Sequence, residues 1–130
     1  MNVCYYLTSH GLGHSVRACA ICERLPHDVH VTFRTAVPKA LFDEELRRPF
    51  EWSEARFDCG CLQSDSVTVD VGRTARAYAR IAVENTKRLC DEAAWLAQRG
   101  ADIVVCDIPS FPFEAARAAG VPSLAVANFT

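Results

Sequence analysis

A histidine and an aspartate, far apart in the sequence, have the residue types of a general-base pair. His14 lies in the stretch TSHGLGHSVR (residues 8–17), directly after one apolar run, and Asp107 follows another, residues 103–106. A carboxylate behind an imidazole fixes the tautomer of the ring and stabilises the imidazolium formed when the ring takes a proton. We therefore predict that His14 is a general base and that Asp107 orients it. The competing interpretations are a solvated His14 and an Asp107 that only caps the next helix.

The two glycines beside this histidine predict a loop that lets a ligand approach the backbone. Gly11 and Gly13 permit a tight turn and carry no side chain. A helix beginning here presents free N–H groups and the positive end of its dipole to a hydroxyl, a phosphate or a carboxylate. We expect His10, Ser15 and Arg17 to contact the substrate together with these glycines. His10 precedes the glycines, so a ligand contact suits it better than the role of base.

Two further loops are expected at the same place in the fold. Ser110 lies in the segment that follows Asp107, and Asp65 lies in the polar, cysteine-containing segment 58–70. We predict that Ser110 contacts the substrate, and that Asp65 does so if the segment 58–70 folds over the site. The alternative for Asp65 is a solvated loop acid.

The glycine loop also invites a dinucleotide-binding interpretation. That fingerprint requires a third glycine, where this chain has Val16, and an acidic residue at the end of the second strand. The second strand instead ends near Arg34, which could contact the 2′-phosphate of NADP. An NADP-dependent oxidoreductase therefore stays open as a third alternative, whereas the GK[ST] of a phosphate-binding Walker loop is missing.

Alternating strands and helices must position these residues. Apolar periodicity and turn signals predict strands over residues 2–8, 29–33, 50–57, 103–106 and 121–127, and helices over 14–25, 38–46, 72–98 and 113–119. This order indicates an α/β class domain over residues 1–130, with a Rossmann-like parallel sheet as the middle of three layers. Ligands of such sheets bind outside the carboxyl ends of the strands.

Helical spacing also predicts which side chains of two helices face the sheet. For the first helix these are Val16, Ala20, Ile21 and Leu25. For the long helix they are Ala75, Ala79, Ala82, Thr86, Leu89, Ala93 and Leu96.

Composition excludes several classes of protein. The 130 residues carry a net charge of −2, which argues against a nucleic-acid partner. The sequence contains neither a bilayer-spanning apolar run nor a signal peptide, so we predict a cytoplasmic protein without a transmembrane segment.

Seven cysteines are present: Cys4, Cys19, Cys22, Cys59, Cys61, Cys90 and Cys106. The spacing of Cys19 and Cys22 leaves a zinc site open as an alternative. We instead expect Cys4, Cys19, Cys22 and Cys106 to be buried packing residues, and we expect no disulfide framework and no bound metal.

Three stretches resemble the N-terminal domain of GT-B glycosyltransferases, in the form found in the N-terminal region of L-arabinokinase and its bacterial relatives. They are residues 5–17 with HGLGHSVR, residues 58–70 with DCGCLQSD, and residues 102–130 with DIVVCD, GVPS and NFT. The resemblance covers essentially the whole chain.

This resemblance implies a two-domain enzyme of which residues 1–130 are the acceptor-binding half. It places the general base at His14 and the orienting carboxylate at Asp107. A small-molecule acceptor would bind here, while a C-terminal domain, absent from this sequence, would bind a nucleotide sugar such as a UDP-sugar. This domain would then bind no cofactor and be inactive alone. The alternative implied is a non-catalytic sugar- or nucleotide-binding module of a sugar-kinase-type protein.

Overall fold

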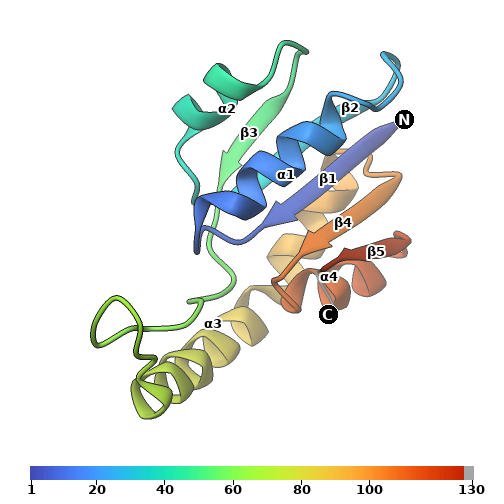
Figure 1. Ribbon diagram of the computed structural model, residues 1–130. Helices are drawn as coiled ribbons and strands as arrows, with labels where there is room; N and C mark the ends of the chain where they lie inside the picture. The colour runs from blue at the N-terminus through green and yellow to red at the C-terminus, as the bar shows by residue number, and fades with distance from the viewer. Residues whose placement is uncertain (128–130) are drawn as a thin grey trace.

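A five-stranded parallel sheet lies between two layers of helices in the computed structural model, which describes residues 1–127 (Figure 1). The elements are β1 (Asn2–Leu7), α1 (Leu12–Cys22), β2 (His30–Thr35), α2 (Lys39–Glu45), β3 (Glu51–Glu54), α3 (Val71–Gln98), β4 (Ile103–Asp107), α4 (Phe111–Ala119) and β5 (Ser123–Val126). The strand order is β3-β2-β1-β4-β5, and every neighbouring pair is parallel. The predicted α/β, three-layer parallel sheet is confirmed. Residues 128–130, part of the resemblance above, lie outside the described residues.

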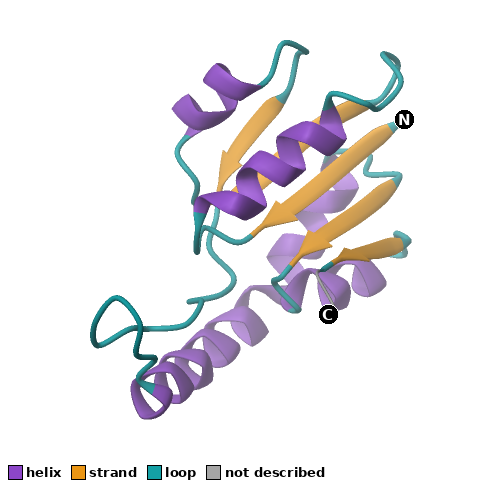
Figure 2. Cartoon of the chain, viewed as in Figure 1, coloured by secondary structure: helices purple, strands orange, loops and turns teal. Residues whose placement is uncertain are grey.

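The central strand β1 is buried on both faces. Tyr5 and Leu7 pack with α1 and α2, whereas Cys4 and Tyr6 pack with α3 and α4. Figure 2 shows these two helix pairs on opposite sides of the sheet. Because a parallel strand covered on both faces needs apolar side chains at its buried positions, residues 3–7 of β1 are a continuous apolar run.

The buried face of α1 differs from the predicted one. Ser15, Ala18, Cys19 and Cys22 face the sheet, whereas Val16 and Ala20 are exposed. Small side chains let the helix approach the sheet closely, and the prediction had followed the larger apolar residues. The helix also ends at Cys22 rather than residue 25, because the chain closes in a turn in which Leu25 N–H donates to the Cys22 carbonyl.

The inner face of α3 also differs from the predicted one. Asn85, Glu92 and Leu96 are its buried residues, and Ala75, Ala79, Ala82 and Thr86 are exposed. The prediction counted apolar residues, but this helix turns Asn85 and Glu92 inward, where the Asn85 Nδ2 donates to the Phe57 carbonyl and Glu92 pairs with Arg34. Its amino-terminal half also extends past the sheet, beside the segment 58–70 (Figure 1), so little of that half can be covered.

A buried ion pair joins α3 to the sheet. The Arg34 guanidinium donates to both carboxylate oxygens of Glu92 at 2.9 Å and lies 4.6 Å from the ring centre of Trp95. The Tyr6 hydroxyl donates to Glu92 at 2.7 Å. The pKa of that hydroxyl is raised, mainly because it is buried and also because the negative charge of Glu92 is close. These contacts occupy Arg34, so the structure gives no support to the predicted alternative of a 2′-phosphate contact.

Among residues 1–127, no helix combines the length and the apolar character needed to cross a membrane.

Candidate functional site

His14 and Asp107 meet at the carboxyl edge of the sheet. His14 is in the first turn of α1, and Asp107 is the last residue of β4, in register with Leu7 of the neighbouring β1. The His14 Nδ1 lies 2.9 Å from the Asp107 Oδ1. Asp107 is completely buried, and the His14 side chain remains 27% exposed. Asp107 does not cap α4, because Ser110 occupies that position.

The contacts of His14 favour one tautomer. Arg17 Nη2 lies 2.6 Å from the Asp107 Oδ1 and 3.1 Å from the His14 Nδ1. A carboxylate accepts and a guanidinium donates, so Nδ1 can satisfy one of these neighbours but not both. With its proton on Nδ1, the ring and Arg17 both donate to the same oxygen. The opposite tautomer would place two acceptors 2.9 Å apart, so we assign the proton to Nδ1 and the free lone pair to Nε2.

Asp107 is surrounded by donors. Besides His14 and Arg17, the Tyr5 hydroxyl lies 3.5 Å from the Asp107 Oδ2. The pKa of that hydroxyl is raised, mainly because it is buried and also because the negative charge of Asp107 is close. The Asp107 backbone carbonyl accepts from Thr8 N–H at 3.1 Å. Arg17 was predicted to contact substrate, and the structure instead shows its guanidinium bonded to the carboxylate that holds His14.

The two glycines of the loop have different roles in the fold. Gly11 is the residue before α1 and has a φ of 92°, a conformation that favours glycine. Gly13 lies inside the helix, and neither glycine has an atom of another residue within 4 Å of where a Cβ would stand. The backbone conformation at position 11 therefore favours glycine. At position 13 the fold does not require glycine, and its lack of a side chain leaves open space over the first turn of α1.

His10 packs against the segment 58–70. A Cβ on Gly60 would lie 2.1 Å from Cγ of the His10 ring, so this contact requires glycine. Gly60 also has a φ of 59°. The segment therefore does reach the loop that carries His10, through the DCGC motif rather than through Asp65.

The remaining predicted substrate contacts have different surroundings. Ser15 is fully buried on the side of α1 that faces the sheet, which argues against the predicted contact. Asp65 is exposed and accepts from the backbone N–H groups of Val67 and Thr68 at 2.9 and 2.8 Å, which lowers the pKa of its carboxyl. Ser110 is exposed and lines a pocket.

That pocket, of about 180 Å³, lies between α3 and the segment that joins β4 to α4. It includes Asp58 and Asn85, neither of which the sequence had singled out. Ile108, directly after Asp107, lines it too and has a φ of 84°, which is strained for a β-branched residue. No signal in the sequence pointed to Asn85, because the predicted inner face of the long helix did not include it.

The cysteines are separate from this site. Cys4, Cys19, Cys22 and Cys106 are buried as expected, and burial raises the pKa of Cys106 to about 12. Within residues 1–127, no group of three or more His, Cys, Asp or Glu side chains could hold a metal ion.

In sequence the chain is similar to a plant sugar kinase. It is 35% identical over 131 residues to the L-arabinokinase of Arabidopsis thaliana, a match that covers 97% of this chain. The chain spans only 12% of the length of that relative. No protein-family model matches the chain.

In structure the chain is similar to plant glycosyltransferases. It superposes on a UGT of Glycyrrhiza uralensis, complexed with glycyrrhetinic acid 3-O-monoglucuronide, with a TM-score of 0.62 and 17% identity over 100% of this chain and 28% of that one. It superposes on a UGT transferase of Siraitia grosvenorii, complexed with UDP, with a TM-score of 0.60 and 13% identity over 95% of this chain and 27% of that one. The domain thus has the Rossmann-like fold of GT-B glycosyltransferases, as the sequence resemblance implied.

The same fold also occurs outside glycosyltransferases. The C-terminal domain of a hydrogenase from Pyrococcus furiosus matches with a TM-score of 0.51 and 12% identity over 95% of this chain and 89% of that one. The fold alone therefore does not assign an activity, and the argument for function has to come from the side chains of the site.

Proposed function

We propose that this domain is the acceptor-binding half of a nucleotide-sugar-dependent glycosyltransferase, with His14 as general base and Asp107 as its orienting carboxylate. The observation that carries this proposal is the 2.9 Å contact between a partly exposed imidazole and a fully buried carboxylate at the ligand-binding edge of the sheet. The GT-B fold and the sequence similarity to a sugar kinase both support carbohydrate chemistry.

In the proposed reaction, Nε2 of His14 takes the proton of an acceptor hydroxyl. The hydroxyl oxygen forms a bond to the anomeric carbon of the sugar, and the bond from that carbon to the nucleotide diphosphate breaks with its electron pair leaving on the diphosphate. Attack opposite the leaving group inverts the anomeric carbon. Asp107 then stabilises the imidazolium. General-base assistance of this kind contributes about 10²–10⁴-fold to the rate.

Arg17 supports the pair rather than acting as the base. Its guanidinium shares the Asp107 Oδ1 with His14 and keeps a positive charge beside the buried carboxylate whether or not His14 is protonated. We therefore propose that Arg17 holds Asp107 in place. The acceptor hydroxyl would enter over His10 and Gly11 of the loop and over Gly13 in the first turn of α1.

The donor in this proposal is a UDP-sugar. A second, C-terminal domain would bind it, in keeping with the small share of the plant transferases that this chain covers and with the UDP in one of them. The free cysteines of the described residues fit a reducing compartment, and we propose a cytoplasmic location.

The decisive experiment is the substitution His14→Ala in the full-length protein, assayed with a UDP-sugar and a panel of hydroxyl acceptors. Loss of the base should lower kcat by about 10²–10⁴-fold with little change in KM. Asp107→Asn should have a smaller effect on kcat if it only orients the ring. The matched control is His27→Ala, which removes an exposed histidine outside the site. A change confined to KM would make His14 a binding residue and reject it as the base.

The similarity to L-arabinokinase supports a second candidate, a non-catalytic sugar- or nucleotide-binding module of a kinase-type protein. This candidate predicts sugar binding without any transfer product. Product formation that depends on His14 would reject it, whereas saturable binding with no product from any UDP-sugar would favour it.

A further inference from the structure

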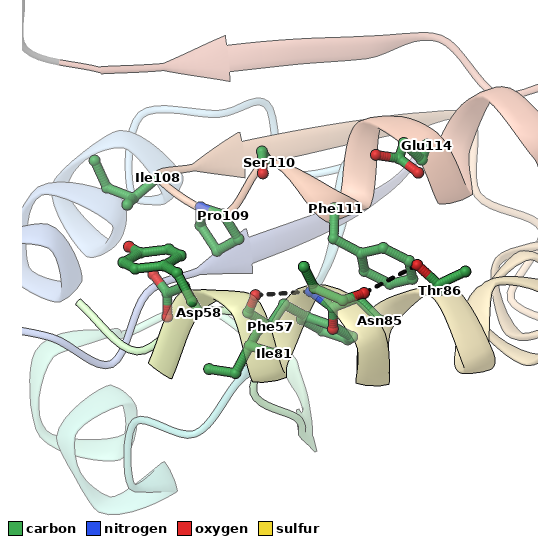
Figure 3. Close-up of a pocket in the computed structure, with 12 residues that line it drawn as sticks. Phe57, Asp58, Ile81, Asn85, Thr86, Ile108, Pro109, Ser110, Phe111 and Glu114 are labelled. Carbon is green, nitrogen blue, oxygen red and sulfur yellow. Dashed lines mark hydrogen bonds between the residues drawn. The ribbon is translucent and has the colours of Figure 1, made fainter. Parts of the chain in front are cut away.

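The pocket between α3 and the β4–α4 segment contains a buried carboxylate without a hydrogen-bond partner. Asp58 is only 5% exposed, and its Oδ2 is fully enclosed and unpaired within residues 1–127. An ionised carboxylate removed from water is costly unless it is paired or hydrogen-bonded. Figure 3 shows Asp58 at one end of the pocket, near Ile108. Such an atom is a position where a ligand can supply the missing donor.

A second unpaired acceptor lines the same pocket. Asn85 is 7% exposed, and its Nδ2 donates to the Phe57 carbonyl at 3.0 Å, which fixes the orientation of the amide. Its Oδ1 is then buried without a partner among the described residues. Asp58 and Asn85 come from different segments, the residues after β3 and the middle of α3, so tertiary folding alone brings their free oxygens to one pocket (Figure 3).

The rest of the pocket wall combines apolar side chains with the polar groups of Tyr78, Thr86, Ser110 and Glu114. Phe57 and Phe111 stack with their ring centres 5.3 Å apart, and Ile81, Ile108 and Pro109 also line the pocket. Among the described residues no lysine or arginine lines it, and Glu114 adds a second carboxylate, so an anionic ligand would find no counter-charge. Acceptor oxygens against aromatic and aliphatic walls suit a ligand that carries several hydroxyl donors on a carbon ring.

From these observations we infer that the Asp58–Asn85 pocket binds adjacent hydroxyl groups of a sugar or a cyclic polyol. The identification of this ligand as the acceptor of the transfer reaction rests on the proposed function above. The claim that the pocket binds hydroxyl groups does not depend on it. Neither His14 nor Asp107 lines the pocket, and the pair and the pocket are linked through the chain, since Ile108 of the pocket directly follows Asp107. The strained backbone of Ile108 bends the chain from the pair to the pocket.

The rim must move slightly for a ligand to reach the enclosed oxygen. Tyr78 and Ile108 line the pocket and are exposed on the outside. They are the side chains able to turn aside without disturbing the core. Their backbone amides, and those of Asp58 and Asn85, should therefore report binding.

The test is a ¹H–¹⁵N NMR titration of the chain with D-glucose, L-arabinose and myo-inositol, each raised to about 50 mM, a range suited to weak binding. We expect saturable shifts at the amides of Asp58, Asn85 and Ile108 with at least one probe. Asp58→Asn should weaken binding about tenfold, because it removes a charge-assisted hydrogen bond. The same variant should melt at a higher temperature than the wild type when no ligand is present.

Asp28→Asn is the matched control, because it makes the same change at an exposed acid that does not line the pocket. It should leave probe binding unchanged. If Asp58→Asn does not fold, Asn85→Ala serves as the second variant and should also weaken binding, although it loses the bond to Phe57.

Three results would overturn the inference: no saturable shift with any probe, an Asp58→Asn variant that binds as the wild type does, or shifts produced only by an amine such as methylammonium. The readout is independent of turnover, since no donor is present. His14→Ala should keep probe binding. A protein that binds sugar but never transfers it would therefore reject the proposed function and leave this pocket standing.

Discussion

Two buried aspartates near the carboxyl edge of the sheet have opposite surroundings. Asp107 ends β4 with no exposed surface and has His14, Arg17 and Tyr5 around its carboxylate. Asp58 follows β3 by four residues, is nearly as buried, and has an enclosed oxygen with no partner among residues 1–127. Both carboxylates have lost water, but the protein replaces that water only at Asp107.

This difference indicates that the carboxylate of Asp107 supports the fold, whereas the fold only tolerates the carboxylate of Asp58. A buried charge with excellent partners can hold elements together, whereas an unpaired one lowers stability. Glu92 resembles Asp107 in this respect, since Arg34 and Tyr6 satisfy it. Only Asp58 lacks such compensation among these three carboxylates, which is the expected mark of a position that serves a ligand instead of the fold.

Removal of the satisfied carboxylate should have the largest effect. Asp107→Ala leaves the Arg17 charge and the His14 N–H beside an uncompensated cavity, so we expect the free energy of unfolding to fall by about 3 kcal/mol. Urea denaturation followed by circular dichroism measures this change. Asp107→Asn keeps the volume and should cost less. A loss below half a kilocalorie for Asp107→Ala would show that the two aspartates do not differ as described.

Replacement of the unpaired carboxylate of Asp58 by asparagine should change the free energy of unfolding in the opposite direction. Asp58→Asn removes a buried charge that no described residue compensates, and we expect the unfolding free energy to rise by about 1 kcal/mol. The comparison is with Asp107→Asn in the same denaturation experiment. If both variants lose stability, Asp58 has a structural partner after all and the contrast fails.

Gly13→Ala should raise the stability of the fold slightly while lowering turnover. A Cβ at this helical position meets open space, so higher helix propensity should stabilise the fold by about 1 kcal/mol. The same methyl group would stand where the acceptor is proposed to enter, so turnover of the full-length enzyme should fall. Gly11→Ala is the contrasting variant and should destabilise, because its φ of 92° is strained for alanine. Unchanged turnover in Gly13→Ala would remove this glycine from the site.

The exposed carboxylate of Asp65 should show the smallest effect. Hydrogen bonds from the backbone N–H of Val67 and from Thr68 hold its pKa below the ordinary value of 3.8. Its folded-state pKa is depressed, so its stabilising effect is complete above the unfolded pKa and is lost as the pH falls through the folded one. A ¹³C NMR titration of the carboxyl carbon should give a midpoint below 3.8. A midpoint at or above that value would mean that the turn does not persist in solution.

Several features of the fold could be predicted from local sequence. Gly120 ends α4 with a φ of 71°, and Pro38 stands immediately before α2, each at a position that local backbone chemistry prefers. The approach of His14 to Asp107 was also open to prediction, because His14 lies in the first turn of the helix after β1, Asp107 ends β4, and the carboxyl ends of these strands share one edge. The sequence did not predict which faces of α1 and α3 are buried, as the buried Ser15 and Asn85 show.

The sequence by itself determined the α/β alternation, the five strands and the edge at which the polar residues gather, because these follow from local periodicity and from the turn preferences of glycine and proline. Only the tertiary structure decided which polar side chains are satisfied. Glu92 meets Arg34 across 58 residues, Asp107 meets His14 across 93, and Asp58 meets no donor among the described residues. The physical reason is that the cost of a buried charge depends on partners distant in sequence, which no local pattern encodes.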